Sequence, residues 1–196
     1  MEQKEKKSIK NRKRIPLFGS LQGLCFSALL TAMSIVLGKF LQIPNPFQEF
    51  IRISFENLPI LMAGITLGPI VGAVVGIVAD LIGCLLYGYA INPIITIGAA
   101  SVGIVSGLIS YIIKNPLVVK VVASIVPAHI VGSVLIKSAG LAMWYLEKYG
   151  LGYWEFVAWR LLNYTLVATA EGIIIYLLLK NKAFRNQIER MRKNEL

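Results

Sequence analysis

The chain has 196 residues, of which 56% are hydrophobic and 15% are charged, with a mean hydropathy of +0.69. A soluble domain carries about a quarter charged residues, so this composition argues against a soluble protein. The formal net charge of +10 lies mostly at the ends, +5 in the first 14 residues and +4 in the last 17, whereas a nucleic-acid-binding domain carries its charge on a folded face.

The first element follows a basic segment over residues 1–20 and is an apolar run over 21–41. About 20 apolar residues span a bilayer core of ~30 Å, whereas a signal peptide has an apolar region of about 7–15 residues. We therefore predict a retained transmembrane helix over 21–41.

The rest of the chain predicts five more helices, of which the first is short. Because irregular backbone at membrane depth must be covered by protein, the loop over 43–56 before that short helix is expected to dip into the fold. Glycines spaced four apart are expected to pack these helices against one another. The predicted helices are 57–67, 69–87, 94–113, 118–145 and 156–179, and the glycines are Gly68, Gly72, Gly76, Gly103 and Gly107.

Loop charges orient the chain, since Lys and Arg gather on the cytoplasmic side. Six crossings place both basic ends and the basic connection over 114–120 on one side, whereas five crossings would separate the ends. The sequence thus predicts an all-α, six-transmembrane-helix bundle with cytoplasmic N- and C-termini. Its domains are a basic tail over 1–20, a membrane domain over 21–180 in the cell membrane and a basic tail over 181–196.

Five ionisable side chains fall inside the predicted helices, where charge is costly and usually functional or paired. The rise of a helix places Asp80 and Lys137 about 10 Å below the outer surface and Arg160 about 6 Å below it. His129 and Glu171 lie about 22 Å deep.

Asp80, Lys137 and Arg160 all lie in the outer third of the membrane. This favours an outward-facing pocket for an anionic ligand, because cations would gather near one opening. Its cations and amides would be Lys137, Arg160, Arg52, Asn92 and Asn163. The alternative is that Asp80 and Lys137 neutralise one another and join two helices.

Two further pairs have two interpretations each. His129 and Glu171 either satisfy one another structurally or form a proton relay. Tyr87 and Tyr89 either belong to an interfacial aromatic belt or stack against a planar ligand.

Enzyme motifs are mostly missing. The single histidine and the lack of GxSxG and Walker A sequences argue against a metalloprotease, a serine hydrolase of that type and a P-loop ATPase. An intramembrane hydrolase would require Ser106 and His129 to lie side by side. No metal and no cofactor are expected.

Several short motifs carry a resemblance to a known family. They are Arg52-Ile53-Ser54-Phe55, Leu58-Pro59-Ile60, Ala63-Gly64, Gly68-Pro69, Gly72, Gly76, Asp80 and Gly83. Together they resemble the substrate-binding (S) components of energy-coupling factor (ECF) vitamin transporters, most closely the folate group. Ala28 and Ala32 are similar to the alanine motif with which such components meet a transmembrane coupling subunit.

The resemblance implies a non-enzymatic subunit that binds a vitamin, most simply folate, for delivery inward. Its implied partners are the coupling subunit and two cytoplasmic ATPases, which hydrolyse the ATP. The loop over 43–56 would act as a lid. Folate is planar with an anionic tail, which suits aromatic side chains combined with cations.

One segment departs from the folate group. Residues 91–96 keep Pro93 and Thr96 but replace a glycine and two phenylalanines, and Glu56 and Asn57 add polar groups where the family is usually apolar. Another planar vitamin or a nucleobase-like compound is therefore the alternative ligand. The expected substrate-binding residues are Arg52, Glu56, Asp80, Tyr87, Tyr89, Asn92, Thr96, Lys137, Arg160 and Asn163, and the expected partner-binding residues are Ala28 and Ala32.

Overall fold

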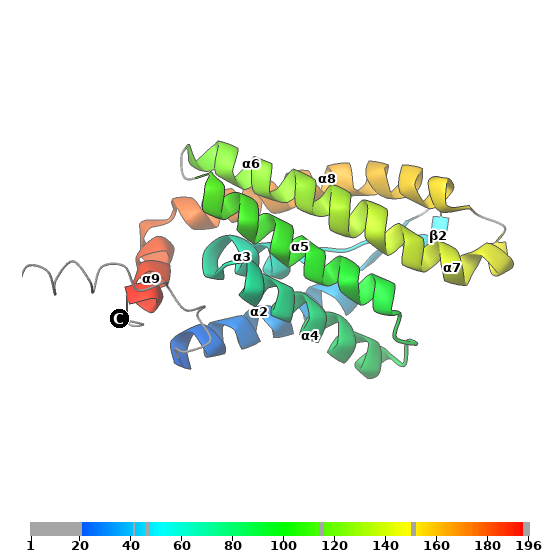
Figure 1. Cartoon of the computed structure of the whole chain (residues 1–196), viewed down its shortest axis with the longest axis horizontal. Coiled ribbons are helices and arrows are strands. Elements are labelled where there is room, and N and C mark those ends of the chain that lie inside the picture. Colours follow the sequence, from blue (N-terminus) through cyan, green and yellow to red (C-terminus); the bar gives the residue numbers. More distant parts are fainter. Residues whose placement is uncertain (1–20, 41, 46–47, 114–115, 150–151, 194–196) are drawn as a thin grey trace, which may run out of the picture.

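Long apolar helices run side by side along the long axis of the molecule (Figure 1). The computed structural model describes residues 21–40, 42–45, 48–113, 116–149 and 152–193. Five of its helical stretches are long and apolar enough to cross a membrane, and α3 is a shorter apolar helix. In chain order the elements are α2 (Leu21–Lys39), β1 (Ile43–Asn45), β2 (Gln48–Ile53), α3 (Asn57–Leu67), α4 (Pro69–Tyr87), α5 (Pro93–Ile112), α6 (Leu117–Ala128), η2 (His129–Ile136), α7 (Lys137–Tyr149), α8 (Tyr153–Lys180) and α9 (Lys182–Lys193).

Glycine and proline set the helix ends that the sequence predicted. Gly68 has a φ of +106° and separates α3 from α4, which begins at Pro69. Proline is tolerated in the first turn because that N–H has no partner within the helix. Pro93 likewise opens α5, and the Asn92 side chain caps it by accepting from the backbone N–H of Ile94 at 3.0 Å.

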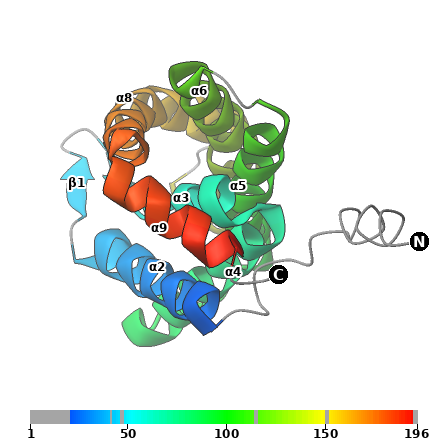
Figure 2. The same cartoon turned by 90° about the vertical axis from the view of Figure 1, so that its left-hand side faces the viewer.

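The short helix α3 occupies the centre of the bundle (Figure 2). All 11 of its residues are buried, and it packs against α4 and α5. The approach is close because glycines face one another: a Cβ on Gly103 would lie 2.2 Å from the carbonyl carbon of Gly72, and one on Gly64 would lie 2.6 Å from the Gly103 oxygen. The expected packing role of spaced glycines is confirmed at Gly72 and Gly103.

One long helix contains a π-helical segment. α6, η2 and α7 follow one another directly and replace the single helix predicted over 118–145. Pro127 lies in the last turn of α6, where it has no N–H for the helical ladder, and the π turns begin two residues later. Such turns often occur at functional sites. Here they position His129, Ser133 and Lys137, which are four residues apart.

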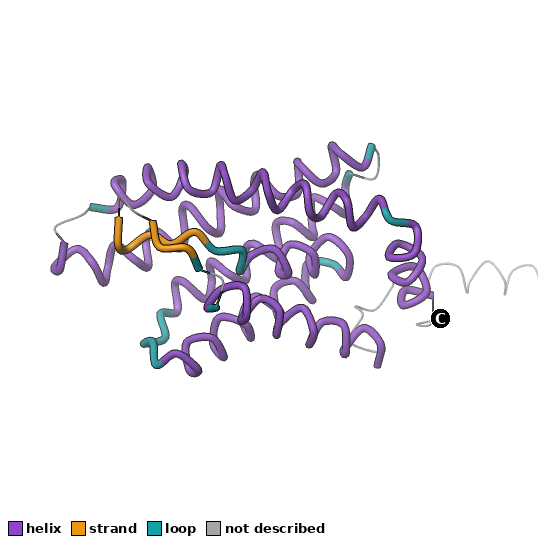
Figure 3. Tube along the Cα trace, turned by 180° about the vertical axis from the view of Figure 1, so that it is seen from behind, coloured by secondary structure: helices purple, strands orange, loops and turns teal. Residues whose placement is uncertain are grey.

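The loop before α3 contains a β-hairpin, which the all-α prediction missed. β1 and β2 pair antiparallel, with Ile43 opposite Ile53 and Pro44 opposite Arg52. The hairpin lies against α8 (Figure 3). The fold is therefore a helical bundle with one short hairpin, and the hairpin carries the chain from the end of α2 into the buried start of α3.

Residues 181–196 include a packed helix, α9, where the sequence analysis expected only a tail. α9 lies across one end of the bundle, in front of α3 in Figure 2. Its apolar residues recur at helical spacing, and the Phe184 ring lies 6.3 Å from that of Phe26 on α2. Ile188 and Met191 are each 6% exposed and belong to the same core cluster as α3. α9 thus covers the end of the bundle that the short central helix leaves open.

The glycine contact between α4 and α5 generates a stability prediction. Gly103→Ala should lower the free energy of unfolding by about 1–3 kcal/mol, because backbone atoms of α4 occupy the space that the methyl group needs. Thermal unfolding in detergent, followed by tryptophan fluorescence, measures the change. Gly152→Ala is the matched control, since nothing lies within 4 Å of its added Cβ. Equal melting of the two variants would show that the contact is not tight.

Candidate functional site

A buried lysine lies at the point where η2 ends and α7 begins. Lys137 is only 4% exposed, and its Nζ donates to Glu56 Oε1 at 2.6 Å. The same ammonium donates to Asn57 Oδ1 at 3.4 Å. Gly98 on α5 makes room for the aliphatic stem, because a Cβ there would lie 2.6 Å from Lys137 Cγ. A charge at this depth requires such partners, since an unpaired buried ion is very costly.

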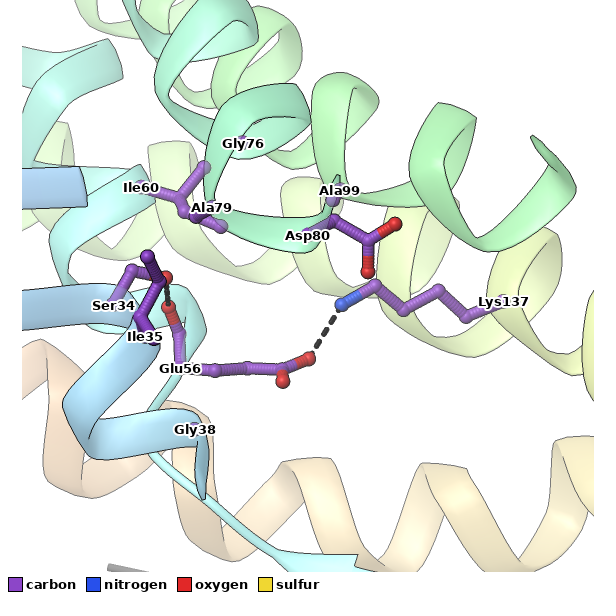
Figure 4. Close-up of a pocket in the computed structure, with 10 residues that line it drawn as sticks. All are labelled: Ser34, Ile35, Gly38, Glu56, Ile60, Gly76, Ala79, Asp80, Ala99 and Lys137. Atoms are coloured by element: carbon purple, nitrogen blue, oxygen red, sulfur yellow. Dashed lines mark hydrogen bonds and ion pairs between the residues drawn. The ribbon is translucent and has the colours of Figure 1, made fainter. Parts of the chain in front are cut away.

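A small cavity opens beside this ion pair (Figure 4). It lies between α2, the start of α3, α4, α5 and α7, and its volume is about 30 Å³. Sites for drug-sized ligands measure roughly 300–1,000 Å³, so a vitamin could enter only if the walls part. The lining residues are Ser34, Ile35, Gly38, Glu56, Ile60, Gly76, Ala79, Asp80, Ala99 and Lys137.

The buried lysine pairs with Glu56 and not with Asp80. Asp80 lines the cavity from α4, but its Oδ2 accepts a hydrogen bond from Thr96 on α5 at 2.6 Å. No ion pair between Asp80 and Lys137 is present in the described part of the chain. The interpretation in which these two residues neutralise one another is therefore wrong. Counting residues along the two helices placed Asp80 and Lys137 at the same depth in the membrane. It could not predict the direction in which each side chain points.

Behind the cavity, hydrogen bonds continue toward the interior of the bundle. Asn57 Nδ2 donates to Ser133 Oγ at 3.1 Å and reaches the Tyr164 hydroxyl at 3.4 Å. Ser133 Oγ lies 3.2 Å from His129 Nδ1, and His129 Nε2 lies 2.6 Å from Glu171 Oε2. We call this set the polar network: Glu56, Lys137, Asn57, Ser133, Tyr164, His129, Glu171 and Arg160.

Arg160 belongs to the polar network but does not line the cavity. Its Nε donates to the Ser133 backbone oxygen at 2.8 Å, and its Nη2 donates to the Tyr164 hydroxyl at 3.2 Å. The guanidinium also lies 5.3 Å from the centre of the Tyr164 ring. In this structure Arg160 therefore joins α8 to η2, so among the described cations Lys137 and Arg160 do not line one opening together.

Four other residues expected to bind the ligand are not among those that line the cavity in the described part of the structure. Asn92 caps α5 and donates to the Gly140 oxygen at 2.9 Å, which ties α5 to α7. The Tyr87 and Tyr89 rings stack with their centres 6.3 Å apart, and Tyr89 is 44% exposed. Asn163 is buried on α8.

The loop cation and the two alanines lie elsewhere. Arg52 is in β2, but its side chain falls outside the described part of the structure. Ala28 and Ala32 are both exposed on α2, one helical turn apart. Their small side chains therefore lie on the outside of the bundle.

The geometry does not support the intramembrane hydrolase. Ser106 Oγ donates to the Gly103 oxygen at 3.1 Å inside the glycine contact of α3 and α5. His129 instead contacts Ser133 and Glu171. A serine nucleophile needs a base within hydrogen-bonding reach, and among the described contacts Ser106 has none.

Sequence reasoning missed the residues that link the charged groups. Ser133 and Tyr164 were not singled out, and Asn57 was noted only as a departure from the family pattern. A signal was present, because Ser133 lies four residues after His129 and four before Lys137. Helical neighbours at that spacing share a face. Tyr164 follows Arg160 at the same spacing.

Comparison with known proteins identifies the family. Residues 22–181 match the family described as "ECF transporter, substrate-specific component". The chain belongs to this family. It is therefore an S component, a transporter binding subunit rather than an enzyme, and a multi-pass membrane protein.

Individual relatives agree with the assignment. Over 64 residues the S component is 31% identical to the folate transporter FolT of Clostridium novyi, a stretch covering 33% of this chain and 36% of that relative. A crystal structure of FolT bound with folic acid superimposes with a TM-score of 0.64 at 20% identity, covering 80% of this chain and 90% of that one. The S component for biotin from an ECF-type transporter gives 0.58 at 20% identity, covering 86% and 96%. At these identities the structural matches establish the fold.

The ion pair of the S component generates a second prediction. Glu56→Gln should lower the free energy of unfolding by roughly 3 kcal/mol, the low end for a broken buried pair, because the Glu56 side chain is itself 31% exposed. The double variant Glu56→Gln/Lys137→Met should recover most of that loss, because no charge is left unpaired. Denaturant unfolding in detergent measures both. Effects that simply add would contradict the pairing, and Glu189→Gln, in an exposed pair on α9, should change little.

Proposed function

We propose that this S component binds a folate-like vitamin at the cavity beside Lys137. The observation that carries the proposal is the ammonium itself, which is buried, lies at a cavity wall and is held by one carboxylate. A carboxylate on a ligand can replace Glu56 as its partner, so the ammonium is poised to exchange a protein anion for a ligand anion. The relative that transports folate and the likeness to folate-bound FolT support this choice of ligand.

Other side chains at and near the cavity suit further groups of such a ligand. Asp80 supplies a carboxylate acceptor at the cavity for an amide or amino N–H of the ligand. The exposed Tyr89 and its stacked neighbour Tyr87 offer a flat aromatic surface near the outer end of α4. Thr96, bonded to Asp80, holds that carboxylate in place.

A second ligand class is supported by one feature of the site. Two carboxylates and one ammonium line the cavity, so its described charge is net negative. A planar vitamin or nucleobase-like compound without an anionic tail would use Glu56 and Asp80 as acceptors and leave the Lys137 ion pair intact.

The proposed topology has six crossings with both termini in the cytoplasm of the cell. The basic charge of both ends supports it. The five long helices would make five crossings, and the short helix α3 would make the remaining one. On the outside of α2, the exposed Ala28 and Ala32 would meet the transmembrane coupling subunit, because small residues let helices approach closely in lipid. Two cytoplasmic ATPases would supply the energy for delivery inward.

Folic acid titrated into the purified protein, followed by tryptophan fluorescence, tests the proposal. The wild-type protein should bind saturably. The double variant Glu56→Gln/Lys137→Met should bind about 10- to 150-fold more weakly, the loss expected for one charge-assisted hydrogen bond. This variant is used because it leaves no buried charge unpaired.

Lys182→Met, at an exposed position on α9, is the matched lysine control and should bind like wild type. Absence of folic acid binding to the wild-type protein would refute folate as the ligand. Tight binding of a neutral planar vitamin, unaffected in the double variant, would favour the second class.

A further inference from the structure

The polar network joins the cavity to Glu171, a deeply buried carboxylate that does not line the cavity. Starting at Lys137, it passes through the Asn57 amide and the Ser133 hydroxyl to the His129 imidazole and ends at Glu171. His129 is 2% exposed and Glu171 is 0% exposed. Each step lies between 2.6 and 3.4 Å, so the row of hydrogen bonds is unbroken.

All donors in this row can point in one direction. An ammonium only donates, whereas an amide and a hydroxyl can accept on one side and donate on the other. With a neutral imidazole protonated on Nε2, Ser133 donates to Nδ1 and Nε2–H donates to Glu171. The row then runs from a positive charge on Lys137 to a negative charge on Glu171.

The far end of the row is incompletely satisfied. Glu171 Oε1 is buried and has no hydrogen-bond partner among the described residues. A buried carboxylate with a free oxygen is costly, so this pair gains from an added proton that His129 can hold next to Glu171. Because Nε2 of His129 and Oε2 of Glu171 are 2.6 Å apart, the charge of an imidazolium would lie directly beside the carboxylate.

The charged and titratable groups around His129 balance when the imidazole is neutral. Tyr164 stacks on it with ring centres 4.9 Å apart. Among the other helices packed here, α5 brings only Tyr111, which is 79% exposed, and α6 brings Lys120 near its far end. The groups that face the imidazole along the network are two acids, two bases and one phenol: Glu56, Glu171, Lys137, Arg160 and Tyr164.

We propose that His129 and Glu171 form a proton-binding site that is loaded when an anionic ligand engages Lys137. The ligand carboxylate draws the ammonium away from Asn57 and adds one negative charge to the network. One proton from solvent then binds Nδ1 of His129, and the resulting imidazolium donates to Ser133 and to Glu171. Only an N–H bond forms, and the Ser133 hydroxyl turns from donor to acceptor. This inference rests on the proposed function, since it requires a ligand at Lys137.

His129 is the single histidine of the chain, so it can be observed without mutation. Tag-free protein with ¹⁵N-labelled histidine would be titrated with acid in detergent by NMR, with and without saturating folic acid. The ligand-free protein should show the ring protonated on Nε2 alone, and folic acid should convert part of it to the imidazolium form. Superimposable titrations, with folic acid bound according to tryptophan fluorescence, would overturn the proton site and leave the proposed function standing. Absence of folic acid binding would refute the proposed function instead, together with this inference.

Calorimetry gives an independent reading of the proton. Folic acid binding would be measured in two buffers of different ionisation enthalpy, for the wild type and for His129→Gln, whose amide can keep both hydrogen bonds. The wild type should take up part of a proton on binding, and the variant should take up none while still binding. Glu189→Gln, on the exposed face of α9, should behave like the wild type. Equal proton uptake by wild type and His129→Gln would overturn the inference.

Discussion

Burying the ammonium of Lys137 among apolar helices is the constraint around which the site is organised. A lysine out of water needs compensating charge and acceptors close by. Glu56 supplies the charge, Asn57 supplies an acceptor and Gly98 leaves room for the stem. The hairpin before α3 and the π turns before α7 bring these groups together from positions 80 residues apart in the chain. The same ammonium is the group that an anionic vitamin would recognise.

A second feature, the close contact of α3, α4 and α5, holds Glu56 at the required depth. Because α3 has only 11 residues, its start lies inside the bundle rather than at the surface. Glycines on the two neighbouring helices allow it to occupy the centre, and α9 covers the end that it does not reach. The same helix therefore contributes to stability and to binding: α3 fills the core, and Glu56 at its start faces the cavity.

The fold could largely be predicted because its boundaries are marked locally. Gly68, Pro69 and Pro93 set helix ends within one residue of the prediction, since their backbone preferences do not depend on distant contacts. The hairpin at 43–53 could not be predicted in this way, because its strands are short and are positioned by α8. The amphipathic spacing of α9 was present in the sequence, but the basic charge of that segment led to its interpretation as a tail.

The candidate site was predictable as a set of buried charges but not as a set of partners. Depth along a helix follows from residue number, so Lys137 and Asp80 were correctly assigned to helices, and only the alternative that paired them with one another is wrong. The direction of each side chain depends on helix rotation and on the π turns, which no local pattern fixes. Arg160 was likewise expected at the cavity, whereas it bonds to the Ser133 carbonyl on η2.

A structure of the purified protein with folic acid bound, by crystallography or electron cryomicroscopy, tests the central role of Lys137 most directly. We expect a ligand carboxylate within hydrogen-bonding distance of Lys137 Nζ, in a cavity enlarged between α2, α4 and α7, with Glu56 displaced from the ammonium. Folic acid bound elsewhere, or bound while Glu56 and Lys137 remain in contact as they are here, would contradict the account.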